Sequence, residues 1–307
     1  QLVKNNYVQS QWGQWYMFGD DGKIVTGPHM WQGSMYYFDP DTYGVVKNDY
    51  RVPTGEKTGY LLGSEGQALT GFQNWQGSRY YFNPSNYKLV TNSYLYVDGN
   101  LYYVDGSGFI NKSSFSNALN QYIVNNHIGH ANIVQHYVIP QNTTGAYRGT
   151  SNGLPNMVIV HETANPNDSI WGEINYEANT YNKAFVHAFV DGNNIIEISS
   201  TDHEAWGAGY PANSRAVQFE QVEVHSAWEF AREISNAAYY TAYNMHKYGM
   251  TPSLGGTLYS HHMISQTFGG TDHTDPDAYW SRNASMFGTG YTMNDFYQLV
   301  QAYYAAI

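Results

Sequence analysis

The segment Met157-Val158-Ile159-Val160 is a run of four apolar residues that is followed directly by His161. A short apolar run of this kind is typical of a strand buried within a sheet. A histidine at the end of such a strand is held on a rigid support, which suits a metal ligand or an acid–base group. The run therefore predicts a central strand that ends in a histidine able to bind a metal or transfer a proton.

The sequence on either side of this run alternates between helix and strand patterns. Expected helices cover residues 113–128, 171–183 and 292–307, and expected strands lie within 184–199, around a turn at 191–194, and at 217–224. A long amphipathic helix is indicated by apolar residues at every third or fourth position, and it ends near Gly249. This apolar face consists of Trp228, Ala231, Ile234, Ala238, Ala242 and Met245. Together these patterns predict an α/β domain with a mixed central sheet flanked by helices.

The N-terminal third of the chain repeats itself and is rich in tyrosine. Residues 31–38 contain Trp-Gln-Gly-Ser and Tyr-Tyr-Phe, both of which recur at residues 75–82, and a weaker third copy covers residues 94–106. Each copy has two aromatic-rich strands around a turn, which is the pattern of a β-hairpin. Because a lone hairpin is marginally stable, the hairpins are expected to stack into an all-β, solenoid-like domain over residues 1–112.

The repeated aromatic residues have two interpretations. They can form the core between stacked hairpins, or they can line grooves that hold sugar rings or a quaternary ammonium group. The candidates for such binding are Trp31, Tyr37, Trp75 and Tyr81. Repetition would let weak sites add through avidity.

Composition excludes several classes of protein. The chain of 307 residues has no cysteine, which removes disulfides, thiolate metal sites and cysteine nucleophiles. Its formal net charge is −11, whereas a nucleic-acid binder normally presents a basic face. No apolar run approaches the ~18 residues of a membrane span. We therefore expect no nucleic-acid partner and no membrane span.

Three segments carry the residues that could hold a metal. They are His161-Glu162-Thr163-Ala164-Asn165, Ser260-His261-His262 and Asp272-His273-Thr274-Asp275. A catalytic zinc site uses three protein ligands, and without cysteine the available set is two histidines and a carboxylate. The alternative is a scatter of surface histidines with no common site.

From about Asn156 to the C-terminus the chain resembles the zinc-dependent N-acetylmuramoyl-L-alanine amidases, and most closely their autolysin branch. The resemblance rests on three motifs in the right order, which are His161–Asn165, Ala184–Gly192, and Ser260-His261 followed by Gly269–Pro276. Residues 12–110 resemble the cell-wall and glucan-binding repeats of Gram-positive surface proteins, although the repeat differs from the ~20-residue choline-binding pattern. The expected domains are wall-binding repeats at 1–112 and an amidase domain at 113–307, with a connecting helix region at 113–136.

The resemblance to the amidases also implies the ligand set. It assigns Zn²⁺ to His161, His261 and Asp275. His262 competes with His261, but neighbours in an extended segment face opposite ways, so only one is expected to ligate. Asp272 and Asp277 compete with Asp275, which alone precedes the proline as the pattern requires.

Further roles follow from the same resemblance. Glu220 is expected to move the proton of the attacking water, with Glu223 as a weaker candidate, and His273 to stabilise the developing oxyanion. His187 could contact substrate or orient the site, or it could be a core histidine. Trp206 could form the base of a groove that binds glycan, or it could be buried and serve only packing.

These assignments predict a peptidoglycan hydrolase that cleaves the amide between N-acetylmuramic acid and L-alanine. It would be secreted and associated with the cell wall, held there by repeats that bind a teichoic acid or a glucan. A phage endolysin of the same chemistry fits the sequence equally well. The alternative of another class is a non-catalytic protein that only binds peptidoglycan or wall polymer.

Overall fold

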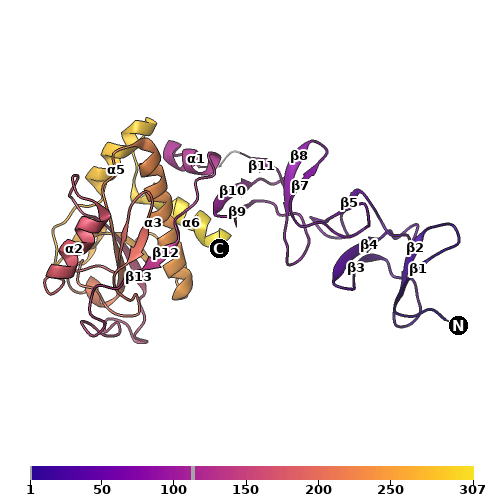
Figure 1. Ribbon diagram of the computed structural model, residues 1–307, viewed down its shortest axis with the longest axis horizontal. Helices are drawn as coiled ribbons and strands as arrows, with labels where there is room; N and C mark the ends of the chain where they lie inside the picture. The colour runs from indigo at the N-terminus through magenta and orange to yellow at the C-terminus, as the bar shows by residue number, and fades with distance from the viewer. Residues whose placement is uncertain (1, 112–114) are drawn as a thin grey trace. The chain divides into compact units, whose positions relative to one another are not determined.

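The computed structural model describes residues 2–111 and 115–307 (Figure 1). These residues pack as two compact units, each with its own internal contacts. The first unit contains residues 2–93 and 104–111, and the second contains residues 94–103 and 115–307.

The first unit is a series of antiparallel hairpins. Their strands are β1 (Asn6–Gln9) with β2 (Trp15–Phe18), β3 (Gly27–Trp31) with β4 (Ser34–Phe38), β5 (Asp49–Arg51) with β6 (Tyr60–Leu62), and β7 (Gly71–Trp75) with β8 (Ser78–Phe82). The repeated Gln-Gly pairs form the turns of two of them, with φ of 48° and 81° at Gln32 and Gly33 and the same values at Gln76 and Gly77. Two consecutive positive φ values are what a two-residue turn of type I′ requires. The expected hairpins are therefore confirmed.

Backbone hydrogen bonds between hairpins repeat with the sequence. The amide of Val45 donates to the carbonyl of Trp15 at 3.1 Å, and the amide of Leu89 donates to the carbonyl of Gly59 at 2.9 Å. Each residue of the second bond lies 44 positions after its equivalent in the first. The hairpins are thus joined in one repeating manner, as a solenoid-like stack requires.

The second unit contains a six-stranded mixed sheet. Its strands are β12 (Ile133–Gln135), β13 (Met157–Glu162), β14 (Ala188–Val190), β15 (Ile195–Glu197), β16 (Ala216–Gln221) and β17 (Leu258–Ser260), arranged in the order β12-β15-β14-β16-β13-β17. Only β14 and β15 pair antiparallel; the other pairs are parallel. The expected α/β domain with a mixed sheet is confirmed.

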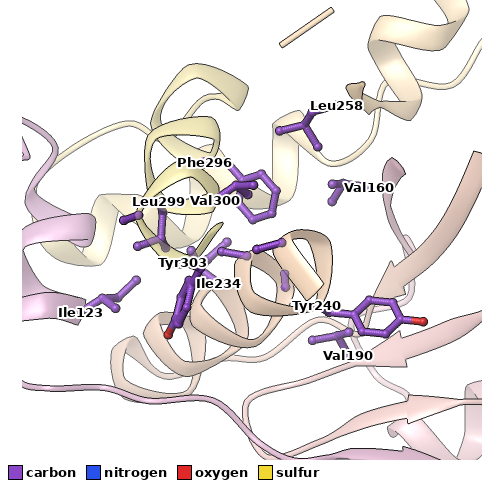
Figure 2. Packing of buried hydrophobic residues seen from close by; sticks show 14 of the residues in the cluster. Ile123, Val160, Val190, Ile234, Tyr240, Leu258, Phe296, Leu299, Val300 and Tyr303 are labelled. Atoms are coloured by element: carbon purple, nitrogen blue, oxygen red, sulfur yellow. The ribbon is translucent and has the colours of Figure 1, made fainter. Parts of the chain in front are cut away.

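Alternate residues of the central strands face two different layers. Val158 and Val160 of β13 lie in the main core cluster with residues of α3 (Ala227–Lys247) and α6 (Met293–Ala306), as Figure 2 shows around Val160, Ile234 and Phe296. Met157 and Ile159 belong to a separate cluster on the opposite face. Helix α2 (Ile170–Thr180) packs through Ile170 and Ile174 on that opposite side, against Phe189 of β14.

The remaining helices differ from expectation in number and length. Helix α1 covers Ala118–Asn125, shorter than the expected 113–128, of which residues 113 and 114 lie outside the described part of the chain. Helices α4 (His261–Thr267) and α5 (Asp277–Ala284) and strands β12 and β17 were not expected, because each is short and lacks a clear period. Trp228 was expected on the apolar face of α3 but is 49% exposed, so that expectation was wrong.

The third repeat packs with the second unit. Its strands are β9 (Ser93–Val97) and β10 (Asn100–Val104), and a short strand β11 (Ile110–Asn111) follows in the chain. The Tyr96 ring stacks on His130 at 4.6 Å between centroids and lies 6.0 Å from the ring of Tyr239. The functional boundary expected between residues 112 and 113 stays a prediction. By packing, residues 94–103 of this hairpin belong to the second unit.

Candidate metal centre and active site

Three side chains converge at the carboxyl edge of the central strands. His161 is the penultimate residue of β13, and His261 is the first residue of α4, directly after β17. Because β13 and β17 are parallel neighbours, their carboxyl ends meet at the same edge of the sheet. Asp275 reaches this edge from the loop that precedes α5.

The atoms of this cluster are close enough to share one ion. Nδ1 of His161 lies 2.9 Å from Nδ1 of His261, which lies 3.1 Å from Oδ1 of Asp275. Oδ2 of Asp275 lies 3.8 Å from Nδ1 of His161. Among the described residues this is the one group of three or more His, Asp or Glu side chains with ligand atoms within 4.8 Å of one another. His161 and His261 are 1% and 4% exposed, so little water competes for these atoms.

The charge states of these residues suit a cation. Burial, followed by the neighbouring His261, lowers the pKa of His161 to about 3, so its ring is neutral and offers a lone pair. Burial by itself would raise the pKa of Asp275, but the hydrogen bond from His261 and the charges of both histidines lower it below its usual range. The set therefore presents a neutral imidazole at His161 and a carboxylate at Asp275, both in the form that a zinc ligand requires.

Neighbouring groups orient the ligands. Nε2 of His261 lies 3.0 Å from Oγ1 of Thr271, and the backbone amide of Glu162 donates to Oδ2 of Asp275 at 3.1 Å. A hydrogen bond on Nε2 leaves Nδ1 of His261 free to ligate. Thr271 was missed at the sequence level, although it lies within the quoted Gly269–Pro276 motif. The signal that could have identified Thr271 is a hydroxyl side chain within the motif that also supplies the expected metal ligand Asp275.

The competing residues lie elsewhere. His262 is bonded through Nδ1 to Oδ2 of Asp277 at 2.7 Å, so these two residues pair with each other. Asp272 is exposed and is not part of the cluster. The reason given for choosing between His261 and His262 was wrong, because the two residues begin helix α4 instead of lying in an extended segment.

Glu220 lies in β16 directly beside His161. The register of the parallel strands β13 and β16 pairs these two residues, so their side chains project on the same face of the sheet. Oε2 of Glu220 is buried and has no hydrogen-bond partner among the described residues. Burial, followed by the charge of Asp275, raises the pKa of Glu220 well above its usual range. Burial therefore favours the protonated form of this carboxyl group.

A cavity of about 210 Å³ adjoins Glu220. Its walls include Glu173, Tyr176 and Glu177 of α2 and Phe189 of β14. The cavity thus lies between α2 and the sheet, on the face that carries His161 and Glu220. A reacting group that contacts Glu220 can reach it from this side.

His273 lies at the exposed side of the cluster. Its Nδ1 is 3.4 Å from Oδ1 of Asp275, and its ring stacks on His261 with centroids 4.3 Å apart. The side chain of His273 is 60% exposed, so a substrate can contact it. This position suits a donor toward a bound carbonyl oxygen.

His187 lies outside the site. It is fully buried; the amide of Gln218 donates to its Nδ1 at 2.9 Å, and its Nε2 donates to the carbonyl of His203 at 2.8 Å. Burial lowers the pKa of His187 to about 4, so the ring is neutral. The alternative of a core histidine fits these contacts, and contact with substrate does not.

Two further candidate residues, Trp206 and Glu223, make contacts within the protein that account for their positions. Trp206 is partly buried and packs against Phe185 with ring centroids 5.5 Å apart, which fits the packing alternative. Glu223 is buried and accepts a hydrogen bond from Arg282.

The repeat aromatics divide between core and surface. Tyr37 is 4% exposed and packs with Tyr60, so it serves the core of the first unit and does not offer a surface to a polymer. Trp31, Trp75 and Tyr81 are partly exposed.

A mixed sheet that carries two buried histidines and a carboxylate at one edge defines an α/β domain with the donor set of a metal-dependent hydrolase. The family model described as N-acetylmuramoyl-L-alanine amidase matches residues 151–278. The structure is similar to that of the hydrolase AmiA of Staphylococcus aureus, crystallised in complex with its ligand. The two share 37% identity with a TM-score of 0.57, and the match covers 63% of this chain and 93% of that one. The chain belongs to the N-acetylmuramoyl-L-alanine amidase family.

Two curated relatives extend the comparison. The Protein Ami of Listeria monocytogenes is 43% identical over 160 residues, which cover 50% of this chain and 17% of that protein. The bifunctional autolysin of Staphylococcus aureus strain NCTC 8325 is 36% identical over 200 residues, covering 63% of this chain and 15% of that protein. The chain thus spans less than a fifth of the length of either relative. Among the described residues, no helix is both long enough and apolar enough to cross a membrane.

Proposed function

We propose that this protein hydrolyses the amide bond between N-acetylmuramic acid and L-alanine in peptidoglycan, using zinc held by His161, His261 and Asp275. The observation that carries the proposal is the convergence of these three side chains beside Glu220. Similarity to AmiA and to the autolysins supports the choice of reaction.

The residues fit a zinc ion by their chemistry. Two imidazole nitrogens and one carboxylate oxygen would supply three protein ligands, the number that a catalytic zinc ion uses. When bound, zinc would lower the pKa of a water molecule to ~7 and polarise a carbonyl group. Thr271 and the backbone amide of Glu162 would hold two of the ligands in place.

Glu220 would exchange protons through Oε2. This oxygen has no other partner among the described residues, so it is free to contact a water molecule or the amide nitrogen of the substrate. Burial raises the pKa of Glu220, and a carboxyl group with a raised pKa is suited to protonating a leaving amine. The oxygen of the attacking water bonds to the carbonyl carbon, and the amide C–N bond breaks as the leaving nitrogen gains the proton from Glu220.

His273 would donate to the carbonyl oxygen as negative charge develops there. It is exposed at the mouth of the cluster, where such an oxygen could lie. Loss of one such donor typically costs ~10²–10³ in turnover.

The repeats would hold the enzyme at the cell wall after secretion. Partly exposed aromatics of the first unit, Trp31, Trp75 and Tyr81, would contact a wall polymer such as a teichoic acid or a glucan. A chain that starts at residue 94 should still hydrolyse soluble peptidoglycan fragments. It should, however, be washed off intact cell walls. Retention equal to that of the full chain would contradict this role.

A soluble muramoyl peptide tests the reaction itself. Catalysis predicts many free L-alanine amino groups released per protein molecule, with the same peptide left intact by the Asp275→Ala variant. The competing function, binding without cleavage, predicts a bound peptide and no new amino groups. The assay does not separate an autolysin from a phage endolysin, since both use the same chemistry.

A further inference from the structure

A second pocket, of about 300 Å³, lies on the second unit and shares no lining residue with the metal cluster or with the cavity beside Glu220. Its walls come from β10, from the loop after α1 and from the start of α3. Its lining residues are Asn100, His127, Ile128, Gly129, His130, Trp228 and Arg232. We propose that this pocket binds a sugar or polyol unit that carries one anionic group.

The walls of this pocket are fixed by close packing. A Cβ added to Gly129 would lie 1.6 Å from the carbonyl oxygen of Gly99, so the turn of the third hairpin rests directly on the loop. The ring of His130 stacks on Tyr239 at 3.2 Å between centroids. The ring of His127 lies 4.5 Å from that of Tyr102. A pocket whose walls are already in contact costs little ordering on binding.

One wall presents an exposed indole. Trp228 is 49% exposed although its helix has a clear apolar face, so its ring is left at the surface. Arg232 follows four residues later on α3, which places the two side chains on the same side of the helix. An aromatic ring beside polar groups in a concave site is the arrangement that small-molecule sites use for affinity and orientation.

The charge of the pocket selects an anion. None of its lining residues is acidic, and among residues 2–111 and 115–307 no carboxylate lies within 4 Å of the Arg232 side chain. Arg232 is partly buried, so its positive charge is retained in a pocket without acids. Its planar guanidinium matches carboxylate and phosphate geometry. The same charge disfavours a cationic ligand on the indole face.

The size and the remaining groups fit one sugar or polyol unit. A volume of about 300 Å³ is at the small end of known ligand sites. The indole can cover the apolar face of a ring. Nδ2 of Asn100 already donates to the carbonyl of Asp98 at 2.9 Å, and its Oδ1 can accept a hydrogen bond from a ligand hydroxyl group. A carboxylated amino sugar of the glycan strand and a polyol phosphate of a wall polymer both offer this chemistry. The site goes beyond the proposed hydrolysis and does not depend on it.

Titration calorimetry on the full chain tests the site with three probes, N-acetylmuramic acid, ribitol 5-phosphate and neutral N-acetylglucosamine. We expect at least one of the anionic probes to bind more tightly than the neutral sugar. The tighter of the two anionic probes shows whether the natural ligand is the glycan strand or a polyol phosphate polymer. Arg232→Gln should weaken the anionic probes about 10-fold and leave the neutral sugar unchanged. Trp228→Ala should weaken all three, whereas Trp171→Ala, which removes a tryptophan that is 50% exposed on α2, should weaken none.

Three results would overturn the proposal. They are equal affinity for the neutral and anionic probes, an unchanged affinity in Arg232→Gln, and absence of binding for all three probes at millimolar concentration. Trp228→Ala removes a half-exposed ring and could destabilise the protein. If it does, Arg232→Gln alone decides the outcome. Hydrolysis of soluble muramoyl peptide should persist in both variants, which separates this site from the proposed reaction.

Discussion

His161 and Glu220 are paired residues of the adjacent parallel strands β13 and β16, and their side chains lie on the same face of the sheet. Neighbouring strands are ~4.8 Å apart, so a proposed metal ligand and a proposed acid–base group stand side by side on rigid supports. Oε2 of Glu220 has no partner among the described residues, which leaves it available for a reacting proton. This relationship connects the fold to the chemistry that we propose.

Substitution of His161 should remove the metal. We expect His161→Ala to lower bound zinc from one ion per chain to nearly none, because two ligands cannot complete the site. Metal analysis of the purified proteins measures this directly. His262→Ala is the matched control, since His262 pairs with Asp277 and should leave the zinc content unchanged. Equal zinc in both variants would show that the cluster does not hold the ion.

Glu220 should affect turnover without affecting the metal. Glu220→Gln keeps the size of the side chain but cannot transfer a proton, so turnover should fall ~10²–10⁴-fold. Zinc content should stay at the level of the unchanged protein. Glu173→Gln alters a carboxyl group of the same cavity and should keep most activity, because Glu173 is already bonded to Asn165. A similar loss in both variants would assign the effect to the cavity and not to Glu220.

Thr271 should set the affinity for the metal through His261. Thr271→Val removes the hydroxyl that contacts Nε2 of His261, and zinc affinity should fall ~10–100-fold. Thr271→Ser keeps the hydroxyl and should restore most of the affinity. Competition with a chelator measures both variants. A serine variant as weak as the valine variant would point to packing as the cause.

His187 should make stability fall in acid. Its pKa is lowered to about 4 in the folded chain against 6.5 ordinarily, so below pH 6.5 the unfolded chain takes up a proton that the folded chain refuses. Stability is therefore lost as the pH falls from 6.5 to about 4, by roughly 3 kcal/mol at most.

The variant His187→Gln isolates this effect. The free energy of unfolding, measured by denaturant at several pH values, should fall less steeply with acid in the variant. His130, whose pKa burial also lowers to about 4, contributes equally to both proteins and cancels in the comparison. Parallel curves for the two proteins would show that His187 is not the group responsible.

Gly129 should be required for docking of the third hairpin. A methyl group at this position meets the carbonyl of Gly99, so Gly129→Ala should destabilise the protein by about 1–3 kcal/mol in chemical denaturation. Gly145→Ala is the control, because nothing lies within 4 Å of its added Cβ. An equal, small effect of both substitutions would mean that the hairpin contact adds little stability.

The sequence was informative where a period or a motif was long. The Gln-Gly hairpins, strand β13 and helix α3 were predictable, since each follows from local pattern and turn chemistry. The short elements β17 and α4 were not, because three residues of strand carry no period and packing determines their form. Family resemblance favoured His261 over His262, and the structure brings His261 into the cluster. The argument from an extended segment did not hold, because both residues begin helix α4.

Side-chain environment was the least predictable part. The sequence places Trp228 on an apolar helix face, yet tertiary packing leaves it half exposed. His187 alternates with Phe185 and Phe189 in the sequence, and only the structure shows that two backbone groups occupy its ring nitrogens. Pairing of Glu220 with His161 depends on strand order, which the sequence does not contain.

Mass spectrometry of digested cell walls tests the central claim most directly. Full-length protein should produce new free L-alanine amino termini on stem peptides and no new reducing sugars, and Glu220→Gln should produce neither. New reducing sugars, cleavage at another peptide bond, or undiminished L-alanine release by Glu220→Gln would contradict the account.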